Sequence, residues 1–101
     1  MSVKMMGSPD AAKLLGITYR QLDYWSGLLG WNTTGTGHHR MFNTGQMVTL
    51  ANLTALVGAG MPPTRAIKHV GRARIVVGDC TITVDLVGIN RRMARAVAGA
   101  K

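Results

Sequence analysis

The stretch from Ser8 to Phe42 constrains the fold most, because one glycine in it separates two short helical patterns. The first pattern runs from Pro9 to Leu15, where Ser8 is a good N-cap and proline suits the first helical position. Gly16 ends it, since glycine readily adopts the left-handed conformation that follows many helices. The second pattern runs from Thr18, another cap residue, to about Leu28. With only a tight turn between them, the two segments predict a helix-turn-helix.

The second helix is expected to bury Leu22 and Trp25, which share one face. Arg20 suits the two hydrogen-bond acceptors on guanine, and Gln21 suits adenine. Tyrosine hydroxyls can reach phosphates. The candidate DNA contacts at the start of this helix are Thr18, Tyr19, Arg20, Gln21 and Tyr24. The alternative is an ordinary amphipathic helix whose polar side chains face water.

A second group of candidate contacts follows this helix, where two glycines fall within one short loop. Residues 31–32 and 38–42 are expected to form two short strands around that loop, as in a wing. Glycines let the backbone approach a phosphate closely, and the loop carries these candidates: Thr36, His38, His39 and Arg40. The two histidines are also potential metal ligands, but adjacent residues of a strand point to opposite faces. No cysteine or carboxylate lies at ligand spacing, so neither a metal nor another cofactor is expected.

The net charge of the chain points to a polyanionic partner. Twelve Lys and Arg residues oppose four acidic residues, which gives a formal charge of +8. Such an excess in a small chain is typical of nucleic-acid-binding proteins, although a merely basic surface is the alternative. The scattered aspartates form no general acid–base pair, and no Ser/His/Asp or Cys/His arrangement is recognisable. We therefore do not expect an enzyme.

The protein is expected to be cytoplasmic. Its one cysteine, Cys80, cannot form an intrachain disulfide, which fits a reducing compartment. Residues 1–7 are expected to form a flexible lead-in, and they contain no apolar core of signal-peptide length. The stretch from Met41 to Thr64 is uncharged, but amides, threonines and two prolines break any apolar run of about 20 residues. We therefore expect no membrane-spanning helix.

The uncharged stretch is instead expected to form a core helix that is capped by Asn43 or Thr44 and ends near Ala59. Apolar residues recur along it at helical spacing: Met47, Leu50, Leu53, Leu56 and Val57. After Gly60, two prolines introduce a fourth, short helix from Arg65 to Val70.

Residues 72–85 follow a different period, with apolar residues at alternate positions on either side of Gly78-Asp79. A two-residue turn there pairs Val77 with Cys80 and Ile75 with Ile82, so one face of the hairpin is apolar. Because a two-stranded hairpin is not stable alone, we expect it to pack on the third helix or against another subunit. A last helix from Leu86 to Ala98 completes a mainly α chain with a small amount of β structure.

The order of these parts resembles the MerR-like winged helix-turn-helix superfamily, which includes bacterial regulators and phage excisionase-type proteins. The likeness rests on residues 10–18, 20–25 and 35–42, and it continues to about residue 70. It implies binding to double-stranded DNA, with the helix from Thr18 in the major groove and Arg40 on the backbone. Lys13 and Arg65 are further candidate phosphate contacts.

The resemblance divides the chain into a DNA-binding domain, residues 1–70, and a possible oligomerisation element, residues 71–101. MerR regulators dimerise through a long C-terminal helix and sense a metal or small molecule, whereas no cysteine cluster or effector domain is recognisable here. We therefore expect a repressor-like, sequence-specific transcriptional regulator without a small-molecule effector, acting as a homodimer or higher assembly on DNA. Three alternatives remain open: a phage excisionase or DNA-architectural protein, a small-terminase-like DNA-recognition protein, and a protein-interaction module that acts through the 72–85 hairpin.

Overall fold

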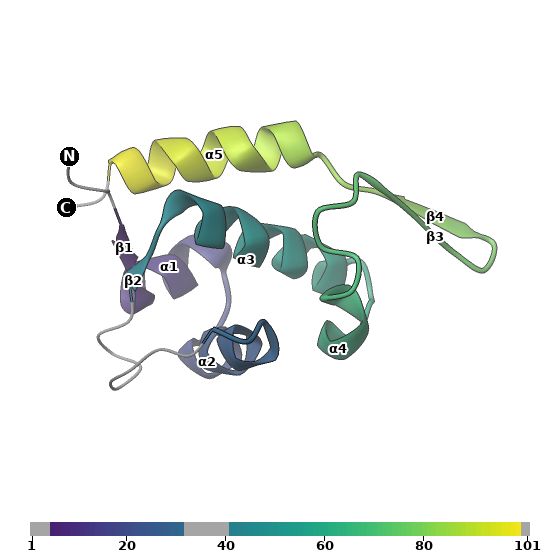
Figure 1. Cartoon of the computed structure of the whole chain (residues 1–101), viewed down its shortest axis with the longest axis horizontal. Coiled ribbons are helices and arrows are strands. Elements are labelled where there is room, and N and C mark those ends of the chain that lie inside the picture. The colour runs from purple at the N-terminus through teal and green to yellow at the C-terminus, as the bar shows by residue number, and fades with distance from the viewer. Residues whose placement is uncertain (1–4, 32–40, 100–101) are drawn as a thin grey trace.

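The computed structural model describes residues 5–31 and 41–99, which form five helices and two pairs of short strands (Figure 1). The helices are α1 (Ser8–Leu15), α2 (Tyr19–Leu28), α3 (Thr44–Gly58), α4 (Pro63–Ala66) and α5 (Leu86–Ala98). The strands are β1 (Met6–Gly7), β2 (Met41–Phe42), β3 (Arg74–Val77) and β4 (Cys80–Thr83). The predicted fold class, mainly α with small β, is confirmed.

The predicted helix-turn-helix is also confirmed. Gly16 ends α1 with a φ of 70°, and its N–H donates to the Lys13 carbonyl at 3.3 Å. This left-handed φ favours glycine, because a Cβ would be strained there. The N–H of Ile17 donates to the Ala12 carbonyl at 3.1 Å, which closes the turn. Thr18 then caps α2 as expected.

The start of α1 differs from the prediction. Its N-cap is Gly7, in an extended conformation, and Ser8 is buried in the first helical turn. The cause is a long-range contact: β1 pairs with β2 in antiparallel fashion, with Met6 opposite Phe42. The chain therefore enters α1 extended through Gly7, and the expectation of a flexible lead-in is wrong for Met6–Gly7.

The partner of β2 also differs from the prediction. Trp31 belongs to no strand, and the remainder of the expected wing, residues 32–40, lies outside the described residues. The Trp31 ring instead lies against the Phe42 ring, with centroids 6.1 Å apart and planes inclined by 46°. Met6 and Phe42 are both buried, so the β1–β2 pair stabilises the fold chiefly by removing apolar surface from water.

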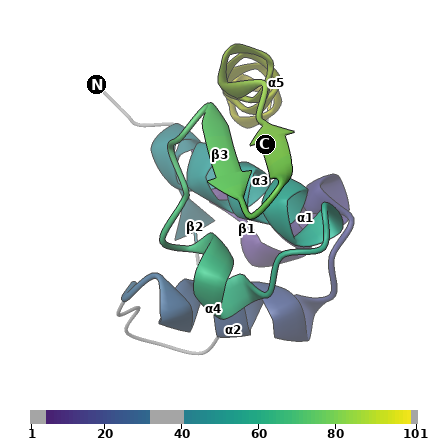
Figure 2. The ribbon, with the colours of Figure 1, turned by 90° about the vertical axis from the view of Figure 1, so that its right-hand side faces the viewer.

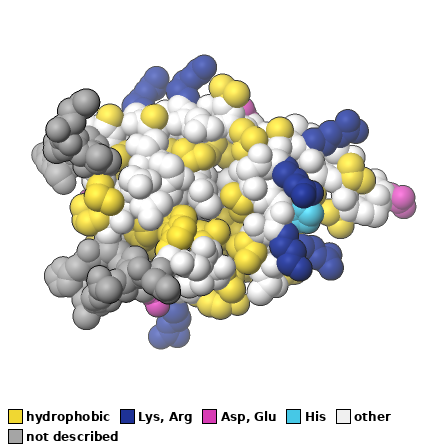
Figure 3. All heavy atoms as spheres, viewed as in Figure 1, with side chains coloured by type: hydrophobic (Ala, Val, Ile, Leu, Met, Phe, Trp, Pro, Cys, Tyr) yellow, Lys and Arg dark blue, Asp and Glu magenta, His cyan; other side chains and the backbone are white. Residues whose placement is uncertain are grey.

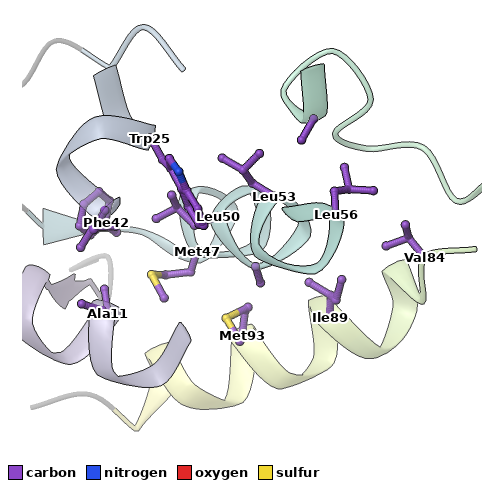
Figure 4. Packing of buried hydrophobic residues seen from close by; sticks show 14 of the residues in the cluster. Ala11, Trp25, Phe42, Met47, Leu50, Leu53, Leu56, Val84, Ile89 and Met93 are labelled. Atoms are coloured by element: carbon purple, nitrogen blue, oxygen red, sulfur yellow. The ribbon is translucent and has the colours of Figure 1, made fainter. Parts of the chain in front are cut away.

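Helix α3 lies at the centre of the molecule, between α2 on one side and α5 on the other (Figures 1 and 2). Four of its apolar side chains are fully buried: Met47, Leu50, Leu53 and Leu56. Figure 4 shows Trp25 and Phe42 on one side of α3 and Ile89 and Met93 on the other. A helix that is apolar over most of its circumference is typical of a core. No helix in the described part of the chain is long and apolar enough to cross a membrane.

Helix α4 begins and ends earlier than predicted. Pro62 is its N-cap and Pro63 occupies the first position, where proline's missing N–H costs nothing. After Ala66 the chain continues in tight turns, in which the Lys68 N–H donates to the Arg65 carbonyl at 3.1 Å. The expected helix to Val70 is therefore a single helical turn followed by a run of turns.

Helix α5 has the predicted bounds and packs along α3 (Figure 1). Asp85 caps it, since its Oδ1 accepts the N–H of Gly88 at 2.9 Å. Ile89, Met93 and Val97 are buried, so the apolar stripe of α5 is satisfied within the chain.

The hairpin of β3 and β4 has the predicted register, with Ile75 opposite Ile82 and Val77 opposite Cys80. Its base is anchored by Ile75 and Val84, which are both buried. Beyond this base the hairpin projects from the helical body (Figure 1). Val76, on its other face, is 65% exposed.

Candidate nucleic-acid interface

Helical spacing places polar side chains of α2 on one face, which is directed toward solvent. Arg20 and Tyr24 lie four positions apart on this face, and both are exposed, Tyr24 by 54%. The opposite face carries Leu22 and Trp25, which are buried. Packing of the inward face on the rest of the fold therefore holds Arg20 and Tyr24 toward solvent, as the sequence predicted.

Thr18 and Gln21 form a reciprocal capping box at the start of α2. The Thr18 Oγ1 accepts the Gln21 N–H at 3.1 Å, and the Gln21 Oε1 accepts the Thr18 N–H at 2.9 Å. Bidentate recognition of adenine uses both the oxygen and the amino group of a glutamine. While the cap is formed, only the Gln21 amino group is available to a base. The two side chains thus first of all fix the start of the helix.

Tyr19 does not share the outward face that the sequence predicted for it. The residue is half-buried, and its hydroxyl oxygen is shielded from solvent. Helical spacing gives the reason, because Tyr19 lies three positions before Leu22 and seven before Ser26, and both are buried. Tyr24, in contrast, is accessible to a phosphate.

The candidate residues of the loop lie outside the described residues: Thr36, His38, His39 and Arg40. The structure does describe the two positions from which that loop departs. The Trp31 and Phe42 rings contact each other there, beside the end of α2. Among the residues that the structure describes, no group of three His, Cys, Asp or Glu side chains is placed to hold a metal ion.

A basic segment, residues 65–74, extends from α4 to the start of β3. Its cationic residues are exposed: Arg65, Lys68, Arg72 and Arg74. Figure 3 shows Lys and Arg side chains gathered near the point where the hairpin leaves the body. The sequence analysis selected only Arg65 from this group. Four cationic residues within these ten positions were the signal in the sequence that could have identified this cluster.

Helix α4, where the basic segment begins, lies on the same side of α3 as α2. Figures 1 and 2 both place α4 and α2 below α3, with α5 above it. Lys13 is exposed in the last turn of α1. The arrangement therefore combines one helix whose outward face can read bases with a neighbouring cluster of cations, which suits contact with a polyanion.

Comparison with known families agrees with this geometry. The family model described as MerR HTH family regulatory protein matches residues 6–72 of this sequence. The matched range covers more than half of the chain and extends from β1 through the turns after α4. No curated protein and no solved structure gives a significant match. Members of this family regulate transcription by binding double-stranded DNA through the helix-turn-helix. The chain therefore belongs to the MerR family of helix-turn-helix regulatory proteins.

Proposed function

We propose that this protein is a sequence-specific repressor that acts by occupying its operator. The proposal rests on the outward face of α2, where Arg20 is exposed at the beginning of the second helix and Tyr24 is exposed one turn later. In helix-turn-helix proteins this is the position that meets base edges in the major groove. The neighbouring basic segment supports phosphate contacts by Arg65, and Lys13 is a further candidate. The loop residues keep the phosphate-binding role proposed from sequence: Thr36, His38, His39 and Arg40.

Affinity for DNA is expected to fall steeply with salt. About 5–8 phosphate contacts would release a similar number of counterions, so log affinity should fall against log salt with a slope of about −5 to −7. Between about 50 and 300 mM salt this corresponds to a loss of more than about a thousandfold. Fluorescence anisotropy with labelled genomic fragments measures the slope. Absence of salt-sensitive binding to any fragment would contradict the proposal.

Arg20→Ala is expected to remove discrimination between the operator and unrelated DNA. A bidentate contact with guanine contributes about 1–3 kcal/mol of discrimination, so the ratio of affinities should fall by about 5- to 150-fold. Arg65→Ala is the matched control, because a lost phosphate contact weakens all sequences alike and lowers the salt slope by about 1. Equal effects of the two substitutions on the affinity ratio would show that α2 does not read bases.

We further propose that two copies bind one operator, and that the projecting hairpin rather than α5 joins them. The support is that α5 packs its apolar stripe on α3, whereas the hairpin projects from the helical body and carries the exposed Val76 (Figure 1). The same arrangement also suits an excisionase-like or architectural protein whose copies assemble side by side and bend DNA. Mass in solution with and without DNA separates the two: two copies per site support the repressor, and longer arrays with DNA curvature support the architectural role.

A further inference from the structure

A groove lies between the end of α1 and the outer side of α5. Its lining combines apolar and cationic side chains: Leu14, Arg91, Arg92, Met93, Arg95 and Ala96. The hollow has a volume of about 350 Å³. A second hollow of about 260 Å³ shares Leu14, Arg92 and Met93 with it and reaches Ala51 and Thr54 of α3. The two hollows therefore form one groove along the valley between α1, α3 and α5.

The groove has an apolar floor and a cationic rim. Leu14 is 43% exposed and lines both hollows, so its side chain is available to an apolar group of a partner. Arg91, Arg92 and Arg95 are all exposed within two turns of α5, and α5 contains no acidic residue. Like charges three or four positions apart destabilise a helix. The helix dipole favours cations toward the C-terminal end of α5 and offsets part of this repulsion, so the three guanidinium groups are held together at the rim of the groove.

This cationic rim does not belong to the proposed DNA interface. Figures 1 and 2 place α5 and α2 on opposite sides of α3, and Figure 3 shows Lys and Arg side chains along the α5 edge. A straight duplex that contacts the outward face of α2 therefore lies on the far side of the molecule from the groove. Arg91, Arg92 and Arg95 remain free to bind a different partner while α2 is on DNA.

We propose that this groove binds an acidic amphipathic segment of a partner protein. One apolar side chain of the segment lies on Leu14 and Met93, and its carboxylates pair with the arginines of the rim. Charge complementarity selects this occupant. A second copy of the chain would bring three more cations to the same place, which is repulsive. A nucleic-acid backbone matches the cations but offers nothing to cover the apolar floor.

The probe for this proposal is a fluorescein-labelled peptide of about 12 residues, with Asp and Glu surrounding one Leu and one Phe at helical spacing. Its control is the same peptide with Asn and Gln in place of the acids. Anisotropy should show saturable binding of the acidic peptide and binding at least about tenfold weaker for the neutral one. Equal binding of the two peptides would overturn the proposal.

Two substitutions locate the binding within the groove. Arg92→Gln should weaken binding of the acidic peptide about two- to fivefold, because it removes one cation from the rim. Leu14→Ser should weaken binding about fivefold, because it removes part of the apolar floor. Arg74→Gln is the matched control: it removes one exposed cation from β3 and should leave peptide binding unchanged. Thermal unfolding followed by circular dichroism verifies that each variant is folded. Unchanged peptide affinity in both groove variants would overturn the assignment.

DNA binding provides an independent measurement, so failure of this proposal and failure of the proposed function are distinguishable. Arg92→Gln and Leu14→Ser should leave the affinity for duplex DNA within about twofold of the parent value. If Arg20→Ala abolishes peptide binding, the peptide occupies the DNA face and the groove assignment is wrong. If Arg92→Gln weakens DNA binding as much as Arg65→Ala does, the arginine rim is a second DNA contact. That result would also overturn the assignment of the groove to a partner protein.

Discussion

Trp25→Ala is expected to destabilise the protein by about 3–5 kcal/mol, because it opens a large cavity next to α3. Trp25 is only 2% exposed and lies on the side of α3 that also carries Phe42 (Figure 4). Small proteins are stable by about 5–15 kcal/mol in total, so this loss is a large part of the whole. Chemical denaturation followed by circular dichroism measures the free energy of unfolding.

Tyr24→Ala is the matched control for this prediction, since it removes the neighbouring aromatic ring from the opposite face of α2. Tyr24 is 54% exposed, so the free energy of unfolding should change by no more than about 0.5 kcal/mol. DNA affinity should nevertheless fall, because Tyr24 is a proposed phosphate contact. Two variants with equal stability would show that Trp25 does not anchor α2 to the core.

Met93→Asp is expected to destabilise the protein by about 3–5 kcal/mol, because it places an unpaired carboxylate between α5 and α3. Met93 is 4% exposed and packs with Ile89 in the layer between these helices (Figure 4). Ala94→Asp introduces the same charge one position on, where the side chain is exposed. This control variant should lower the free energy of unfolding only by the difference in helix propensity between alanine and aspartate, about 0.5–1 kcal/mol.

The Met93→Asp result also tests how α5 is used. If α5 were a dimerisation helix, the substitution would lower the mass in solution and leave the unfolding of the monomer largely unchanged. Packing on α3 within one chain predicts the opposite, a loss of stability that does not depend on protein concentration. Denaturation at two protein concentrations that differ about tenfold distinguishes the two arrangements.

Local chemistry accounts for the side-chain orientations on α2 that were predicted correctly. Arg20 and Tyr24 follow from the helical period that buries Leu22 and Trp25. Thr18 was correctly predicted as the N-cap of α2, whereas Gln21 was interpreted only as a base contact, although its spacing from Thr18 is that of a capping box. Tyr19 was misplaced because its distance from Leu22 and Ser26 was not considered.

The cationic groups were harder to assign from the sequence. Net charge indicates a polyanionic partner without saying which face meets it. Only the packing of α4 beside α2, and of α5 on the far side of α3, divides the cations into two separate surfaces (Figure 2).

The sequence by itself determined the elements whose causes lie within a few residues. The left-handed turn at Gly16, the caps at Thr18, Asn43 and Asp85, and the hairpin register around Gly78 all depend on neighbours close in the chain. The tertiary structure alone decided the pairing of Met6 with Phe42, and with it the start of α1. It also decided that α5 docks on α3. Such contacts join residues far apart in sequence, and their stability comes from buried apolar surface, which no local pattern specifies.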